Sequence, residues 1–352
     1  MNFDFTQKMM VWNHTENNRS MPWKGEKDPY KIWLSEIILQ QTRVEQGLAY
    51  YNKFIETFPT VKKLANAPEE KVFKLWEGLG YYSRCKNLIA SAKIIDSVYK
   101  GRFPDTYENI LALKGIGPYT AAAIASFAFN LPYAVVDGNV LRVLSRYFGI
   151  STPIDSTTGK KLYNQLADSL LDKENPGVYN QAIMDFGAVV CKPQNPLCGA
   201  CPQKQECRAF QQAWVNDLPV KEKVLKKKTR YMYYFAISVN GKTFVKKREA
   251  KDIWQNLHEF VLHEHDEPID WTKKNLKEAV KSFIDKPFQL QEISTIVKQQ
   301  LTHQLIIGQI IKITVQTPID IPGYDLLPDK EIKKLAFPKF INTLMQQEAV
   351  LF

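Results

Sequence analysis

Four cysteines within 17 residues limit what this chain can fold into more than any other feature. Cys191, Cys198, Cys201 and Cys207 are separated by six, two and five residues, and only Cys85 lies elsewhere in the 352 residues. This distribution is not a disulfide framework, because that requires cysteine pairs spread over a small secreted fold. We therefore expect one metal site with four thiolate ligands, in a reducing compartment.

The spacing of these cysteines favours an iron–sulfur cluster over zinc. Thiolates suit either metal centre, but structural zinc sites usually join two separated Cys-x2-Cys pairs. Here only Cys198 and Cys201 form such a pair. Zinc and four unligated thiols stay as alternatives. Pro193, Pro196 and Pro202 interrupt the loop, which hinders regular secondary structure, so the expected role of the metal is structural.

The charge of the chain favours an anionic partner. Lys and Arg number 47 against 37 Asp and Glu, a net charge of +10, which favours nucleic acid, with lysines that serve only solubility as the alternative. Asp4 and Lys8 within a short polar start argue against a signal peptide. The uncharged stretch 115–136 is interrupted by Pro118 and Pro132. It therefore predicts a buried helix, and we expect no association with a membrane.

A basic segment at 221–230, KEKVLKKKTR, marks a boundary between two domains. Before it the segments have helical periodicity. After it a β-rich run at 231–239 is followed by Asn240-Gly241, a hairpin turn signal, and a return strand at 243–246. We expect a multi-domain protein: an all-α domain at 1–209, a basic linker at 210–230 and an α/β domain at 231–352.

The segment after Asp28 predicts a helix that carries a desolvated carboxylic acid. Asp28-Pro29 suits a helix start, so the helix is expected from Tyr30 to about Gln41. Glu36 shares a face of this helix with apolar residues. Burial raises the pKa of a carboxyl group, as a general acid near neutral pH requires. A surface glutamate at a helix edge is the alternative.

The sequence LKGIGPYTA at 113–121 predicts a tight turn between two helices. Gly115 and Gly117 allow backbone amides to approach an anion, and the following helix adds its positive N-terminal end. We therefore expect this hairpin to bind phosphate. A simple helix–helix connector is the alternative.

A second carboxylate, Asp137, follows an apolar run and is placed to cap the next helix. The helix dipole and amide hydrogen bonds favour its ionised form, so its pKa is expected to be low, although plain capping is the alternative. Glu36 and Asp137 would then differ in protonation, as the acid and the anionic stabiliser of glycosidic cleavage do. In a basic hairpin protein this combination indicates cleavage of an N-glycosidic bond in DNA.

Taken together, these motifs resemble the adenine DNA glycosylase (MutY-type) branch of the helix-hairpin-helix glycosylase superfamily. The motifs are PWKGEKDPYKIWLSEIILQQTRV at 22–44, GLGYYSRCKNL at 78–88, LKGIGPYTAAAIASFAF at 113–129, VDGNVLRV at 136–143 and the cysteines at 191–207. The resemblance implies a 4Fe-4S cluster and removal of adenine opposite 8-oxoguanine or guanine in double-stranded DNA. It also implies a monomeric, cytoplasmic, nucleoid-associated bacterial protein.

The resemblance assigns catalytic roles by position. Glu36 protonates N7 of adenine, and Asp137 stabilises the oxocarbenium ion or forms a transient covalent adduct. Tyr119 and Asn139 position Asp137 and the intermediate.

Residues that contact DNA are assigned in the same way. Gln41 and Tyr81 wedge into the duplex where the adenine is extruded, with ordinary packing as the alternative. After the basic segment the chain resembles a Nudix-like domain that reads 8-oxoguanine, without the glutamate-rich box of a pyrophosphatase. The family's Phe-Ser-His loop reads Leu301-Thr302-His303 here. Thr302 and His303 keep the hydroxyl and the ring, while the loss of aromatic stacking leaves the strength of lesion discrimination open, and a loop histidine without a ligand is the alternative for His303.

Two other functions fit part of the pattern. An endonuclease III-like bifunctional glycosylase and lyase for oxidised pyrimidines needs an amine nucleophile. In that branch the lysine occupies the position of Tyr119, and Lys114 lies on the other side of the turn. A non-catalytic iron–sulfur DNA-binding protein would need neither Glu36 nor Asp137. The sequence does not decide whether clamp or mismatch-repair proteins bind.

Overall fold

The computed structural model describes residues 2–222, 227–346 and 349–350. The chain divides into two compact units: unit 1 holds residues 1–66 and 87–224, and unit 2 holds residues 67–86 and 225–352. The expected all-α part followed by an α/β part is thus confirmed in its coarse form. Residues 223–226 of the basic segment lie outside the described residues. Within the described chain, we find no helix with the length and apolarity needed to cross a membrane.

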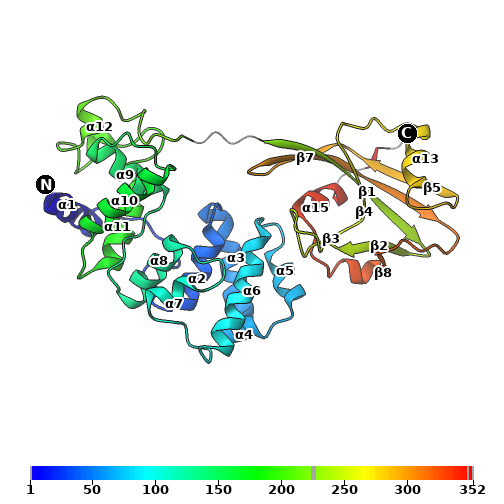
Figure 1. Ribbon diagram of the computed structural model, residues 1–352, viewed down its shortest axis with the longest axis horizontal. Helices are drawn as coiled ribbons and strands as arrows, with labels where there is room; N and C mark the ends of the chain where they lie inside the picture. Colours follow the sequence, from blue (N-terminus) through cyan, green and yellow to red (C-terminus); the bar gives the residue numbers. More distant parts are fainter. Residues whose placement is uncertain (1, 223–226, 347–348, 351–352) are drawn as a thin grey trace. The chain divides into compact units, whose positions relative to one another are not determined.

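Unit 1 is built from helices, drawn from blue to green in Figure 1. Its helices are α1 (Asn2–Thr15), α2 (Pro29–Leu39), α3 (Val44–Thr57), α4 (Val61–Ala65), α7 (Tyr107–Leu111), α8 (Pro118–Phe129), α9 (Gly138–Phe148), α10 (Thr157–Leu170), α11 (Pro176–Val189), the short 3-10 helix η1 (Cys198–Ala200) and α12 (Arg208–Gln211). Helix α5 (Glu69–Trp76) belongs to unit 2, and α6 (Tyr82–Ser97) begins in unit 2 and continues into unit 1.

Helix α1 completes the core of unit 1 through contacts with residues far along the chain. Phe5 is fully buried and packs on Tyr147 of α9, with ring centroids 4.6 Å apart. The hydroxyl of Thr6 donates to the carbonyl of Leu170 at 2.7 Å. The amide of Gln203, near the cysteines, donates to the carbonyl of Phe5 at 2.9 Å. The first helix therefore joins helices α9 to α12 into one core.

Capping residues start the two helices that carry the predicted carboxylates. The side chain of Asp28 accepts a hydrogen bond from the backbone N–H of Tyr30, and Pro29 is the first residue of α2, as expected. Helix α2 ends at Leu39, earlier than expected, and Gln41 beyond it has a φ of +55°. A left-handed residue cannot continue a right-handed helix. Helix α2 packs on α8, and α8 and α9 both pack on α11.

Part of the segment expected to be a linker is bound to unit 1. The carbonyl of Leu218 accepts a hydrogen bond from Nε of Arg146 at 3.0 Å. The backbone N–H of Ile154 donates to the carbonyl of Val220 at 3.0 Å. Strand β1 then begins at Lys228. The segment 212–222 is therefore hydrogen-bonded to unit 1, and composition alone does not reveal this.

Unit 2 contains a mixed β-sheet with short helices (Figure 1). In the described residues its strands are β1 (Lys228–Val239), β2 (Lys242–Lys247), β3 (His258–Glu259), β4 (Val261–His265), β5 (Phe288–Ser294), β6 (Val297–Gln300), β7 (Gln304–Val315), β8 (Asp325–Pro328) and β9 (Ala349–Val350), and its further helices are α13 (Lys273–Lys281), α14 (Asp329–Ile332) and α15 (Lys339–Met345). The main order is β3-β2-β1-β7-β5-β9, with β1 parallel to β7 and antiparallel to β2. The expected β1–β2 hairpin at Asn240-Gly241 is confirmed.

The long strand β1 is buried on both faces, so its apolar run is continuous and does not alternate. Tyr233 and Phe235 belong to the apolar cluster that contains the buried residues of α13. Tyr234, which points to the other face, packs its ring near Phe340 of α15, with centroids 6.4 Å apart. Helices α13 and α15 thus contact side chains of β1 that point to opposite faces of the sheet.

Candidate active site

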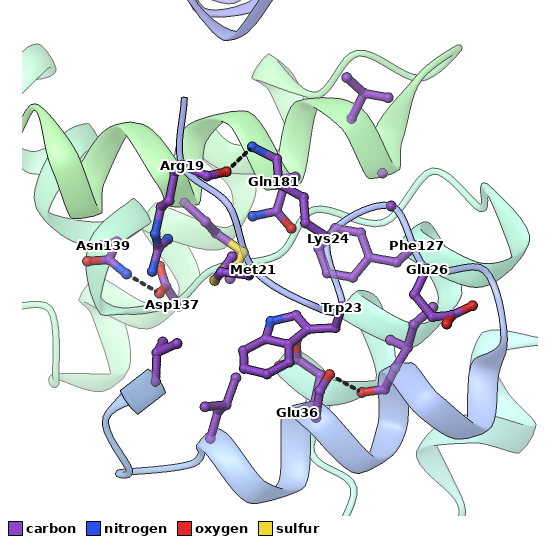
Figure 2. A pocket seen from close by; sticks show the side chains of 18 of the residues that line it. Arg19, Met21, Trp23, Lys24, Glu26, Glu36, Phe127, Asp137, Asn139 and Gln181 are labelled. Carbon is purple, nitrogen blue, oxygen red and sulfur yellow. Dashed lines mark hydrogen bonds between the residues drawn. The ribbon is translucent and has the colours of Figure 1, made fainter. Parts of the chain in front are cut away.

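A cavity of about 470 Å³ lies within unit 1. Its walls come from α2, α8, α9, α11 and residues 17–28, which we call the N-terminal strap. Figure 2 shows Glu36 and Asp137 among the side chains that line it. The lining residues that carry polar or charged groups are Asn13, Arg19, Lys24, Glu26, Lys27, Ser35, Glu36, Gln40, Thr42, Tyr119, Asp137, Asn139 and Gln181. The predicted catalytic residues, which are far apart in the sequence, therefore meet at one cavity.

Glu36 is a buried carboxylic acid, with 9% of its surface exposed. Burial raises its pKa from 4.5 to about 7, a hydrogen bond from Tyr119 lowers it, and the charge of Asp137 raises it further. A pKa near 7 leaves a substantial fraction of the group protonated at neutral pH. The expectation of a raised pKa is confirmed, and Glu36 is suited to donate a proton.

The pKa of Asp137 is raised, and the prediction of a low pKa was wrong. The cap is formed as expected, because Oδ1 of Asp137 accepts a hydrogen bond from the backbone N–H of Val140 at 2.8 Å. Burial is the larger effect and raises the pKa, while hydrogen bonds from Val140 and Asn139 and the charge of Arg142 lower it. Capping was visible in the sequence, whereas burial depends on the packing of separate helices.

Asn139 links Asp137 to the loop that contains the cysteines. Its amide donates to Oδ2 of Asp137 at 2.7 Å, as Figure 2 shows. Its carbonyl oxygen accepts a hydrogen bond from Nη2 of Arg142 at 2.9 Å, and Nε of Arg142 donates to the carbonyl of Cys191 at 2.8 Å. Because Arg142 also donates to the carbonyl of Gly187 at 2.6 Å, its guanidinium group has a fixed orientation. Asp137 therefore sits at the end of a chain of directional hydrogen bonds.

The N-terminal strap is held by Asp185, a fully buried acid on α11 that the sequence analysis missed. Its carboxylate pairs with Arg19 at 2.7 Å and with Lys24 at 3.0 Å, and it accepts hydrogen bonds from Asn17 at 3.0 Å and Gln181 at 2.9 Å. A buried charge requires such partners. The signal in the sequence is an acid within the otherwise apolar run of α11.

The strap brings further side chains to the cavity that were not predicted. Arg19, Met21 and Trp23 line it, and Gln181 lines it from α11 (Figure 2). The cavity thus combines aromatic and apolar surface with hydrogen-bonding groups, as a site for a planar heterocycle needs. Arg19, Met21 and Trp23 are spaced by two residues, as on one face of an extended segment, but this spacing does not reveal which surface the segment covers.

The glycine hairpin between α7 and α8 has the predicted geometry. Gly115 has a φ of +75°, and Gly117 is the N-cap of α8 with Pro118 at the first helical position. Both glycines are exposed. A Cβ on Gly115 would lie 2.6 Å from the side chain of Asn87, while a Cβ on Gly117 would meet nothing within 4 Å. The turn therefore exposes its backbone at the positive N-terminal end of α8, where binding of an anion is favoured.

The two predicted wedge residues, Gln41 and Tyr81, share an unusual backbone conformation. Their φ angles are +55° and +49°, and both side chains are exposed. Positive φ is uncommon for residues other than glycine and occurs often at functional sites. Gln41 belongs to unit 1 and Tyr81 to unit 2.

The segment Leu301-Thr302-His303 forms the turn of the β6–β7 hairpin in unit 2. The backbone N–H of Leu301 donates to the carbonyl of Gln304 at 2.8 Å, which closes the turn. The hydroxyl groups of Thr302 and Tyr81 lie 2.6 Å apart. The structure thus brings together two of the predicted DNA-binding residues. His303 is exposed.

The four cysteines cluster beside the core of unit 1. Cys191, Cys201 and Cys207 pack against this core, and the charges of Cys191, Cys198 and Cys207 raise the pKa of other thiols in the group. Burial raises the pKa of these three thiols, and Nη1 of Arg146 donates to Sγ of Cys191 at 3.6 Å. Among the described residues, no three His, Cys, Asp or Glu side chains are arranged to hold one metal ion. Four thiols of one loop are the donor set that a 4Fe-4S cluster uses.

Cys85 lies apart from this group on α6. It is fully buried, and burial raises its pKa well above the usual value. It is thus a packed core residue and not an accessible thiol.

Comparisons with known proteins give the same family by two routes. Residues 34–168 match the family described as "HhH-GPD superfamily base excision DNA repair protein". The chain is 39% identical over 273 residues to "Adenine DNA glycosylase" from Buchnera aphidicola subsp. Acyrthosiphon pisum, which covers 77% of each chain. It is 41% identical over 223 residues to "Adenine DNA glycosylase" from Homo sapiens, covering 61% of this chain and 41% of that protein.

Solved structures resemble the helical part. The structure described as a thermostable thymine-DNA glycosylase has a TM-score of 0.56 and 30% identity, and it covers 60% of this chain and 97% of that one. The alignment with the Buchnera protein extends further, because 77% of this chain is longer than unit 1.

Proposed function

The chain belongs to the adenine DNA glycosylases of the HhH-GPD superfamily, and we propose that it removes adenine mispaired with 8-oxoguanine, or with guanine, from duplex DNA. The reaction is acid-assisted hydrolysis of the N-glycosidic bond. The observation that carries this proposal is the meeting of Glu36 and Asp137, from different helices, at one cavity with polar and aromatic walls.

Glu36 supplies the proton in this reaction. A neutral carboxyl group with a pKa of about 7 donates to N7 of the adenine as the glycosidic bond breaks. Protonation makes the base a better leaving group, because the electrons of the C1′–N9 bond pass into a neutral purine and not into an anion. Tyr119, which is hydrogen-bonded to Glu36, orients the acid.

Asp137 stabilises the positive charge that develops on the sugar, or captures it in a transient covalent adduct. Its ionised form is favoured by the hydrogen bonds from Asn139 and the backbone of Val140. The mutual repulsion of Glu36 and Asp137 in a buried site favours one shared proton, so that one group is the acid and the other the anion. Water then completes the hydrolysis at C1′.

Binding of the duplex uses exposed elements of both units. The hairpin at Gly115 and Gly117 binds a backbone phosphate. Gln41 and Tyr81 fill the stack that the extruded adenine leaves. The α/β unit acts as a Nudix-like domain in which Thr302 and His303 read 8-oxoguanine on the opposite strand. The excess of Lys and Arg makes this binding sensitive to salt.

The four cysteines hold a 4Fe-4S cluster in this proposal. The grouped thiols beside the unit 1 core support it. When bound, the cluster supplies four covalent cross-links to a loop with little regular structure. Residues Cys191, Cys198, Cys201 and Cys207 order the loop, and the bond from Arg142 to the carbonyl of Cys191 transmits this order to Asn139. We place the protein in the cytoplasm, with the nucleoid.

The geometry favours hydrolysis over the lyase alternative. Two lysines, Lys24 and Lys27, are among the residues that line the cavity. A Schiff base requires a neutral amine. Both amines are occupied by other contacts: Lys24 pairs with Asp185 at 3.0 Å, and Lys27 donates to the carbonyl of Phe127 at 3.0 Å.

The test is single-turnover release of free base from duplexes that contain adenine opposite 8-oxoguanine, compared with a duplex that contains thymine glycol. We expect adenine release that is lost in Glu36→Gln, with alkali needed to break the strand. Excision of thymine glycol with strand cleavage in the absence of alkali would establish the lyase instead. Tight binding of the mispair without release of adenine would support the non-catalytic alternative.

A further inference from the structure

The loop between α5 and α6 has an energetically unfavourable backbone conformation. Gly78, Gly80 and Tyr81 have φ angles of +89°, +81° and +49°. Glycine tolerates these values, but a tyrosine does so only at a cost on the order of 1–2 kcal/mol. Such a conformation persists where surrounding contacts enforce it.

The flanking helices hold the inner side of this loop. The carbonyl of Gly80 accepts hydrogen bonds from Nε1 of Trp76 at 3.0 Å and from Nη2 of Arg84 at 3.3 Å. The guanidinium of Arg84 also lies over the rings of Trp76 and Tyr81, 5.3 Å from each centroid. These contacts fix one face of Tyr81 while its side chain stays 44% exposed.

The two ends of the loop are attached to the C-terminal part of unit 2. At one end the hydroxyl of Tyr81 is 2.6 Å from that of Thr302 in the β6–β7 turn. At the other end Oε1 of Glu77 accepts hydrogen bonds from the backbone N–H of Phe337 at 2.8 Å and from the amide of Asn342 at 2.9 Å. The segment therefore belongs to unit 2 although its sequence lies between helices of unit 1.

Glu77 makes stronger contacts than Glu70, a second acid in this segment that pairs with a lysine. Its side chain is 18% exposed, and its second oxygen pairs with Lys74 at 2.7 Å, while Lys74 also donates to the carbonyl of Leu335 at 2.8 Å. Charge-assisted bonds of this length are stronger than neutral ones. By contrast, Glu70 and Lys247 are 3.6 Å apart with 62% and 36% exposure, a geometry that contributes little.

We propose that Glu77 is a positioning residue for Tyr81: it ties the loop to residues 337–342, so that the wedge tyrosine and the Thr302 turn are held as one rigid element. Wedge insertion is then coupled to the base on the opposite strand, because both contacts come from unit 2. The inference rests on the proposed roles of Tyr81 and Thr302 in DNA binding. In this proposal Glu77 acts through the loop that carries Tyr81 and not by contact with the DNA.

The experiment uses the 352-residue chain with the Glu36→Gln substitution, which we expect to bind duplex DNA without releasing adenine. Duplexes carry adenine opposite 8-oxoguanine or guanine, with 2-aminopurine in the neighbouring base pair as a reporter of unstacking. We expect Glu77→Ala to reduce the fluorescence rise on binding and to lower the preference for 8-oxoguanine by roughly 10-fold, the scale of losing bonds to a charged group. Glu77→Gln keeps the acceptor for Phe337 and Asn342 and should restore most of both readouts.

Three further variants separate the outcomes. Asn342→Ala removes one partner and should give a smaller change in the same direction if Glu77→Ala does not fold. Glu70→Gln, the matched control on the same segment, should leave both readouts unchanged. Tyr81→Ala should abolish the fluorescence rise. If it does and Glu77→Ala has no effect, the positioning role is overturned while the proposed function stands. If Tyr81→Ala has no effect, the wedge assignment itself fails.

Discussion

The amide nitrogen of Asn139 lies 2.7 Å from Oδ2 of Asp137, and the carbonyl oxygen of the same side chain accepts a bond from Arg142 at 2.9 Å. An asparagine amide can rotate and exchange its two ends, but the guanidinium fixes the oxygen on the far side. The N–H groups must then face the carboxylate. Asn139 therefore favours the charged form of Asp137.

Asn139→Ala should slow adenine release by roughly 10-fold or more, because a hydrogen bond to a charged group is lost. The pKa of Asp137 is already raised by burial and should rise further. The fall of the single-turnover rate on the acidic side should therefore begin at a higher pH. Asn164→Ala, on the exposed side of α10, is the control, since its amide donates to the carbonyl of Lys160 in the same helix and to no other group in the part of the chain that the structure describes. An unchanged pH profile would argue against this role.

The rate of adenine release should decline as the pH rises through about 7, where Glu36 loses the proton that it donates. A profile measured under single-turnover conditions from pH 5 to 9 tests this. Glu36→Gln should lose this alkaline limb together with nearly all activity. A rate that stays constant up to pH 9 would contradict the role of Glu36 as the acid.

Glu36→Gln should also stabilise the fold at alkaline pH. The pKa of Glu36 is raised by burial from 4.5 to about 7, so its contribution to stability is complete below pH 4.5 and is lost as pH rises to about 7. The loss is on the order of 3 kcal/mol, from the difference between the two pKa values. Urea unfolding at pH 5 and pH 8 should therefore show a larger advantage of the glutamine variant at pH 8. Equal differences at both pH values would contradict a raised pKa of the Glu36 carboxyl group.

Cys198→Ser should lose the iron–sulfur cluster, while Cys85→Ser should keep it. Cys85 is buried on α6, away from the four grouped thiols. The purified protein should contain about four irons per chain, as a cluster with four cysteine ligands requires. Iron analysis and visible absorption measure this directly. Stoichiometric zinc without iron would support the other metal considered.

Gly115→Ala and Gly117→Ala should affect the hairpin differently. At Gly115 a Cβ would lie 2.6 Å from Asn87 and the φ is +75°, so alanine should cost about 1–2 kcal/mol of stability as well as DNA affinity. At Gly117 the φ is −98° and a Cβ meets nothing. Alanine there should preserve the melting temperature but weaken duplex binding, because the methyl group occupies the approach of a phosphate. Unchanged binding in both would exclude the turn as a phosphate site.

Features that depend only on residues close in the sequence could be predicted from the sequence. Asp28 and Asp137 were identified as caps because a cap needs only the residues that follow it. The Asn240-Gly241 hairpin is similarly local. A raised pKa of Glu36 could be predicted from the apolar residues on its own helix face, and burial raises this pKa as expected.

The remaining features depend on contacts between distant segments. The raised pKa of Asp137 reflects burial by other helices. The N-terminal strap forms no helix or strand, and its course is set by ion pairs with Asp185, far along the chain. Residues 67–86 group with the C-terminal unit through Glu77 and Tyr81, and no composition change marks that segment. Tertiary pairing of this kind leaves no signal in one sequence.

The attachment of α1 to residues near the cysteines has a consequence for synthesis on the ribosome. Thr6 bonds to a residue 164 positions later, and Phe5 and Lys8 bond to residues 198 positions later. The first helix must therefore wait, without its final partners, until the chain has been translated past Glu206 and that stretch has left the exit tunnel. The N-terminal half of the glycosylase core cannot mature first, so a stalled or truncated chain that ends before this point would expose Phe5 and its apolar neighbours to chaperones and proteases.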